Sequence, residues 1–71
     1  MNKDVNRQIY ELLLAVANDE VCFEDKHGDE WELGKYDRVD GELVFWLASW
    51  GKPTEYYSLL EVDKRLMELL Q

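Results

Sequence analysis

The stretch that decides the fold is EVCFEDKHGDEWEL, residues 20–33. Apolar and other side chains alternate over residues 21–24 and again over residues 30–33. Such alternation is typical of a strand with one buried face, because successive side chains point to opposite sides. Residues 25–29 between them are polar and include Gly28, a residue type that suits a turn. The stretch therefore predicts a β-hairpin with one apolar and one acidic face.

A second hairpin is predicted to follow. Residues 36–39 lead into Asp40-Gly41, a dipeptide that favours a two-residue turn, and residues 42–50 return. The run LVFWLA, residues 43–48, is apolar on both faces. It predicts a central strand, or one whose far side is covered by a partner chain. A short final strand is expected at residues 54–57.

Helices are predicted at both ends of the chain. Apolar residues recur at helical spacing between residues 4 and 17, with Asp4 or Asn2 as the N-cap. Ser58 and Glu61 have the spacing of a capping box, which starts a second helix. The expected buried stripes are Val5, Ile9, Leu12, Leu13 and Val16 in the first helix, and Leu59, Val62, Leu66, Leu69 and Leu70 in the second. The expected fold is α+β, with one domain over residues 1–71: a four- or five-stranded antiparallel meander flanked by N- and C-terminal helices.

The charge of the chain is concentrated in its middle. Sixteen acidic residues oppose eight basic ones, for a net charge of −8. Residues 19–42 hold ten of the acids and three of the bases, so this segment carries −7 of the total. A nucleic acid or a membrane surface would repel such a protein, whereas a basic partner would be attracted. Charge that served only solubility would be spread more evenly.

The sequence offers little for catalysis or metal binding. Its one histidine, His27, lies in a predicted turn, and its one cysteine, Cys22, lies between Glu20 and Glu24, where a reactive thiolate is disfavoured. One cysteine and one histidine cannot make a zinc site, and the acids lack the spacing of a calcium loop. We therefore expect no enzyme activity, no catalytic residue, no metal and no cofactor. A single cysteine also excludes an internal disulfide and fits a reducing cytoplasm.

Binding to another macromolecule explains the acidic segment better. Alternate residues of a strand lie on one side about 7 Å apart, so Glu30 and Glu32 are expected to present their carboxylates in a row. Proteins that bind DNA meet its phosphates with Lys and Arg, and a carboxylate array can engage the same side chains. The expected partner-binding residues are Asp19, Glu20, Glu24, Asp25, Asp29, Glu30, Glu32, Asp37, Asp40 and Glu42. The alternative is that these acids are only the solvated faces of strands.

The tryptophans have two expected roles. Trp31 lies on the apolar face of the first hairpin and is expected in the core. Trp46 and Trp50 lie on the other side of their strand from Phe45, so one side is expected to be core and the other an interface. An uncovered apolar face over residues 43–50 would predict a homodimer.

In its size, its acids gathered between Asp19 and Glu42, and its helix-flanked strands, the chain resembles the short acidic host-takeover proteins of bacteriophages, some of which act as DNA mimics. The resemblance implies an inhibitor that occupies the DNA-binding surface of a basic protein in the cytoplasm of the bacterial host. Known targets of the class include nucleoid-associated HU-type histones, DNA repair glycosylases, restriction enzymes and CRISPR effectors. An HU-type histone is the expected target, because its basic arms and saddle could accept a small acidic domain.

The main alternative is an interaction protein that is not a mimic, such as an immunity protein, an antitoxin or an adaptor. Its binding would depend chiefly on Trp46, Trp50, Tyr56 and Tyr57, with charge at the rim. A mimic should lose affinity steeply with salt, compete with DNA and fail when its acidic row is neutralised. An aromatic-centred binder should instead fail when a tryptophan is changed to alanine.

Overall fold

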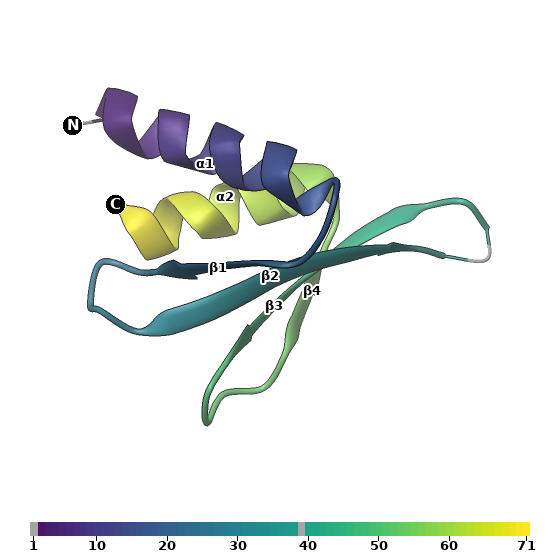
Figure 1. Ribbon diagram of the computed structural model, residues 1–71. Coiled ribbons are helices and arrows are strands. Elements are labelled where there is room, and N and C mark those ends of the chain that lie inside the picture. The colour runs from purple at the N-terminus through teal and green to yellow at the C-terminus, as the bar shows by residue number, and fades with distance from the viewer. Residues whose placement is uncertain (1, 39) are drawn as a thin grey trace.

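The chain forms two layers, with both helices on one side of a four-stranded sheet (Figure 1). The computed structural model describes residues 2–38 and 40–71. The elements are α1 (Asn2–Val16), β1 (Val21–Glu24), β2 (Glu30–Asp37), β3 (Leu43–Ser49), β4 (Glu55–Tyr57) and α2 (Leu59–Leu70). The strands are antiparallel and lie in the order β1-β2-β3-β4. This confirms the predicted α+β fold, an antiparallel meander flanked by N- and C-terminal helices, in its four-stranded form.

The strand β2 is continuous where the sequence predicts two strands with a break between them. Gly34 and Lys35 do not interrupt it, because they pair with Trp46 and Phe45 of β3. The five-stranded alternative is therefore wrong. The indole of Trp46 occupies the space in which a side chain at position 34 would lie. The glycine thus marks a close approach between two strands and does not end one of them.

The β2–β3 connection is wider than the predicted two-residue turn. The backbone N–H of Arg38 donates to the carbonyl oxygen of Glu42 (2.8 Å), so residues 39–41 lie between the paired residues. The N–H of Gly41 donates to the carbonyl oxygen of Arg38 (2.8 Å), and Gly41 has a φ of +85°. A residue in this left-handed region is typical of the longer hairpin loop that contains a bulge. Residue 39, the expected end of the strand before the turn, lies outside the described residues.

The core lies between the helices and the side of the sheet that faces them. Its buried side chains are Ile9, Val16, Phe23, Trp31, Leu33, Phe45, Leu47, Val62, Leu66 and Leu69. The predicted core position of Trp31 is confirmed, and so are both helical stripes apart from one residue. Leu59 is 51% exposed at the first position of α2, where the buried stripe has ended, so its predicted burial is wrong.

The two helices differ in how well their starts are predicted. The side chain of Ser58 accepts a hydrogen bond from the N–H of Glu61 (3.3 Å), and the Glu61 carboxylate accepts one from the N–H of Ser58 (2.9 Å). The predicted capping box of α2 is therefore confirmed. By contrast, α1 includes both Asn2 and Asp4, so neither precedes the helix as an N-cap. A carboxylate in the first turn still suits the positive end of the helix dipole.

Candidate functional site

One side of the sheet is not covered by the helices, and we call it the open face (Figure 1). Successive side chains along a strand point to opposite sides. Phe45, Leu47 and the other buried strand residues face the helices, so the residues that alternate with them point away from the helices. The residues of the open face are Cys22, Glu24, Glu30, Glu32, Gly34, Tyr36, Val44, Trp46, Ala48 and Tyr56. Three of them are acidic, three are aromatic and none is Lys or Arg.

One half of the open face is acidic. Glu24 of β1 lies opposite Glu30 of β2, and Cys22 lies opposite Glu32. Glu20, just before β1, lies beside Glu32, and its pKa is raised above the ordinary value chiefly because a protonated Glu20 can donate a hydrogen bond to the Glu32 carboxylate. The four carboxyl groups of Glu20, Glu24, Glu30 and Glu32 form what we call the acidic half. This is the expected row, extended across the first hairpin.

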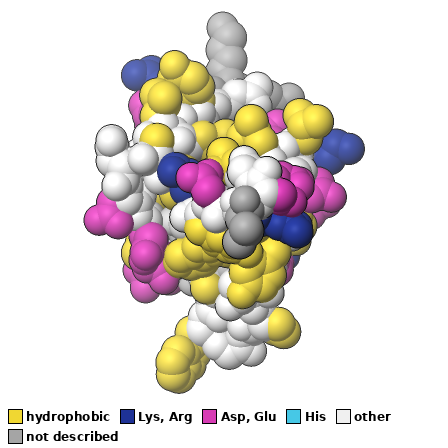
Figure 2. Space-filling model, turned by 90° about the vertical axis from the view of Figure 1, so that its right-hand side faces the viewer, with side chains coloured by type: hydrophobic (Ala, Val, Ile, Leu, Met, Phe, Trp, Pro, Cys, Tyr) yellow, Lys and Arg dark blue, Asp and Glu magenta, His cyan; other side chains and the backbone are white. Residues whose placement is uncertain are grey.

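The other half of the open face is aromatic. Trp46 of β3 lies between Gly34 of β2 and Tyr56 of β4, and Tyr36 lies opposite Val44. Tyr36 is 46% and Tyr56 60% exposed, while Trp46 is partly buried. We call Tyr36, Val44, Trp46 and Tyr56 the aromatic half. Figure 2 shows hydrophobic side chains gathered on the side away from the helices, below the tip of the β2–β3 hairpin.

Trp50 is separate from the aromatic half. The strand β3 ends at Ser49, and Trp50 stands in the β3–β4 turn, which is closed by a hydrogen bond from the N–H of Lys52 to the carbonyl oxygen of Ser49 (3.1 Å). Its side chain is 98% exposed. The two tryptophans expected at an interface therefore differ in setting: Trp46 lies within the sheet, and Trp50 projects from a turn.

Asp25 is turned inward, unlike the other predicted partner-binding acids. It is 9% exposed, and one of its carboxylate oxygens accepts a hydrogen bond from the indole N–H of Trp31 (2.9 Å). The other oxygen accepts from the backbone N–H groups of His27 (2.8 Å) and Asp29 (2.9 Å). These bonds, and the one from Trp31 above all, hold the pKa of Asp25 below its ordinary value. The carboxylate organises the first hairpin, so we leave Asp25 out of the partner-binding surface.

The remaining predicted acids are exposed, and they lie in or beside the turns or, for Asp37, at the end of β2. They are Asp19, Asp29, Asp37, Asp40 and Glu42. Asp29 is paired with Lys52 of the neighbouring β3–β4 turn (Oδ2 to Nζ, 3.3 Å). Asp19 accepts a hydrogen bond from the N–H of Glu20 (2.8 Å), next to the acidic half. The others lie at or near the tip of the β2–β3 hairpin.

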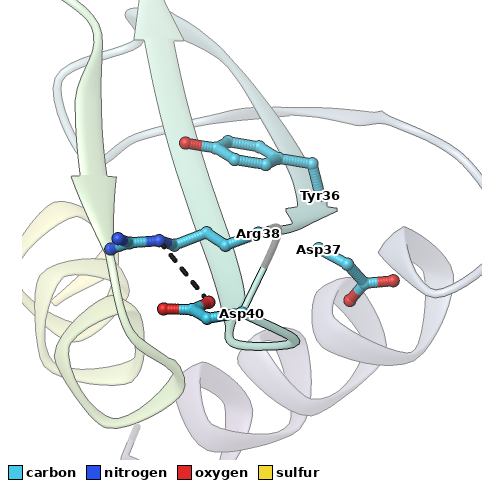
Figure 3. A pocket seen from close by; sticks show the side chains of 4 residues that line it. All are labelled: Tyr36, Asp37, Arg38 and Asp40. Atoms are coloured by element: carbon cyan, nitrogen blue, oxygen red, sulfur yellow. Dashed lines mark ion pairs between the residues drawn. The ribbon is translucent and has the colours of Figure 1, made fainter.

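An open hollow lies at that hairpin tip, lined by Tyr36, Asp37, Arg38 and Asp40 (Figure 3). Figure 3 shows the side chains of Tyr36 and Arg38 extending to one side of the hairpin and that of Asp37 to the other. Arg38 Nε lies 3.8 Å from Asp40 Oδ1, and both side chains are more than half exposed. Such a pair contributes little to stability, but it places one cation at the end of the aromatic half.

The structure gives no sign of a metal centre in residues 2–38 and 40–71. In this part of the chain no three His, Cys, Asp or Glu side chains are grouped so that they could hold a metal ion. His27 is exposed in the β1–β2 turn, and Cys22 is exposed on the open face. None of the helices described is both long and apolar enough to cross a membrane.

No family model, curated protein or solved structure matches this chain. The resemblance to acidic bacteriophage proteins therefore stays a prediction, and a function has to be argued from the open face.

Proposed function

We propose that this protein is a DNA-mimicking inhibitor, which uses the open face to occupy the DNA-binding surface of a basic bacterial protein. The observation that carries the proposal is the acidic half, in which Glu20, Glu24, Glu30 and Glu32 share one side of the sheet. The strand positions described on that side contain no Lys or Arg to neutralise them. The face is therefore anionic as a whole.

Crowding of like charge weakens a fold, so the acidic half costs stability in the free protein. The raised pKa of Glu20 is a sign of this repulsion, because its carboxyl group holds a proton more tightly beside Glu32. Lys and Arg of a DNA-binding surface would relieve the repulsion, as they do when they neutralise phosphates. This gives the acidic half a use that simple solvation of a strand does not.

An HU-type nucleoid-associated histone is the first partner to test, as the resemblance implies. Such an inhibitor would act in the cytoplasm of the bacterial host cell, where the histone and its DNA are found. The chain would bind the histone and not the nucleic acid, which its charge of −8 repels.

The test is a competition between this protein and a fluorescent DNA duplex for a purified HU-type histone. We expect release of the duplex, with an affinity for the histone that falls linearly on a logarithmic salt scale. Changing Glu30 and Glu32 together to Gln should weaken competition roughly tenfold. The matched control changes Glu11 and Asp63 to Gln and Asn, which removes the same charge from exposed helical positions.

Mimicry would be excluded if the histone bound without releasing DNA, or if the control pair weakened competition as much as the Glu30 and Glu32 pair. Release of DNA from a different basic protein would preserve the mechanism and change only the partner.

The second candidate is a protein-binding module centred on the aromatic half. The exposure of Tyr36 (46%) and Tyr56 (60%) beside Trp46 favours it, since aromatic residues are enriched among the residues that dominate binding energy. Such a module would keep its affinity in moderate salt and after the Glu30 and Glu32 changes, and would lose it on Trp46→Ala.

A further inference from the structure

The acidic half and the aromatic half meet between Glu32 and Trp46. Glu32 lies opposite Ala48, and the next open-face residue along β2, Gly34, lies opposite Trp46. Glu32 and Trp46 are therefore diagonal neighbours on adjacent strands, a separation of about 7–8 Å that long side chains bridge. A carboxylate and an indole, both partly exposed, are thus neighbours on the open face.

This combination suits one type of side chain in particular. The guanidinium group of arginine is planar, binds a carboxylate through two N–H groups and stacks on aromatic rings. The ammonium group of lysine is a strongly hydrated point charge that does not make the paired contact.

The covered side of the sheet already holds an arginine in this way. Arg65 of α2 donates to both carboxylate oxygens of Glu55 (Nε to Oε1, 2.8 Å; Nη2 to Oε2, 3.2 Å). Its Cζ atom lies 5.8 Å from the centre of the Trp31 ring. The open face presents the same two groups, a glutamate and a tryptophan, to the outside.

We infer that the open face selects arginine over lysine in its partner, and that an arginine side chain is seated between Glu32 and Trp46. The inference rests on the proposed function and adds the chemistry of the partner: an arginine-bearing segment of a basic protein. Tyr36 and Tyr56 extend the aromatic surface for neighbouring arginines, and Glu24 and Glu30 extend the acidic one.

A second copy of this chain does not fit the open face. The face carries glutamates and no Lys or Arg at its described strand positions, so two copies would oppose carboxylates without counter-charges. Arg38, the cation at the end of the aromatic half, is already paired with Asp40. The homodimer that an uncovered face would predict is therefore opposed by charge, whereas a cationic partner is complementary to it.

The test compares two capped peptides of equal length and charge, in which serine alternates with arginine in one and with lysine in the other. Calorimetric titration at low salt should show the arginine peptide binding roughly two- to fivefold tighter, the range expected for an exposed cation–π contact. Trp46→Leu should lower the affinity of the arginine peptide more than that of the lysine peptide, and so remove most of the preference. Tyr10→Leu, at an exposed position of α1, is the control and should change neither.

Each outcome is decisive. Equal affinity of the two peptides for the unaltered protein would overturn the arginine preference and leave the proposed function standing. Binding of neither peptide would remove both. If Trp46→Leu lowers the unfolding temperature too far, Tyr56→Leu at a more exposed position takes its place and should reduce the preference. Self-association through the open face, seen as backbone amide shifts of β3 that depend on concentration, would replace the arginine partner with a second copy.

Discussion

The indole ring of Trp46 fills the space that a side chain at position 34 would need. A Cβ atom on Gly34 would overlap the Cζ2 and Cε2 atoms of that ring. The two residues are directly paired across β2 and β3. Because Gly34 has no side chain, the indole of Trp46 can lie flat against the sheet. The position of this ring therefore depends on a glycine in another strand.

Gly34→Ala should displace Trp46 and lower the free energy of unfolding by about 1–3 kcal/mol, as overpacking does in a close-packed site. The indole N–H resonance of Trp46 should move, while those of Trp31 and Trp50 stay in place. In a Trp46→Ala background the same glycine change should cost much less, because the clash is gone. Additive costs in this double-mutant cycle, measured by urea unfolding, would show that the two residues do not interact.

Asp25 should make the free energy of unfolding depend on pH. Its pKa is lowered in the folded state, chiefly by the hydrogen bond from Trp31, so its contribution is present above the ordinary aspartate pKa of about 4 and is lost as pH falls through the lowered value. Asp25→Asn should therefore be less stable than the unaltered protein at neutral pH, and the difference should close in strong acid. Urea unfolding across this range measures the difference. A gap that is independent of pH would mean that the carboxylate charge plays no part.

Glu20 should couple partner binding to proton release. Its pKa is raised by the hydrogen bond and the charge of Glu32, with a smaller effect of Asp19. A group with a raised pKa keeps its proton to higher pH, and an arginine partner prefers the carboxylate. Affinity for the arginine peptide should therefore fall as pH falls through that pKa.

Calorimetry in buffers with different ionisation enthalpies measures the released proton. Glu20→Gln should abolish the release, while Glu24→Gln, a change of the same charge within the acidic half, should weaken binding and leave the release intact. Equal release from both variants would assign the proton to another group.

Arg65 tests the arginine chemistry within the fold itself. Arg65→Lys should lower the free energy of unfolding by about 1–2 kcal/mol, because lysine cannot donate to both oxygens of Glu55 while lying over Trp31. Arg7→Lys is the matched control: Arg7 contacts Glu11 at 3.4 Å, but its side chain is 80% exposed, so no measurable change is expected. Equal effects of the two changes would show that the forked contact has no special value.

The predictions that succeed are those that depend on neighbours in the chain. Alternation over residues 21–24 and 30–33 predicts Trp31 inside and Glu30 and Glu32 outside, and the Ser58 to Glu61 spacing predicts the start of α2. The break between strands expected after residue 33 is wrong, because Gly34 makes room for the indole of Trp46 in the neighbouring strand and does not end β2.

Other features depend on contacts between distant parts of the chain, which the sequence pattern does not show. Asp25 looks like one more surface acid in the sequence, and only the return of the hairpin brings the indole N–H of Trp31 to it. The covered side of β3 likewise cannot be chosen from LVFWLA, which is apolar on both faces. That choice follows from how α1 and α2 pack, since both lie on the side of Phe45 and Leu47.

Because the helices shield one side of the sheet, the residues that form the core and those proposed to bind a partner alternate along the same strands. A substitution at an outward position of β1, β2 or β4 touches few core atoms, so it can change the chemistry of the open face at little cost to the stability of the fold. Natural selection can then revise the outward chemistry quickly while the inward residues stay constant. Gly34 and Trp46 are the exception, because the outward ring of one occupies the space above the other. These two positions are expected to change together or not at all.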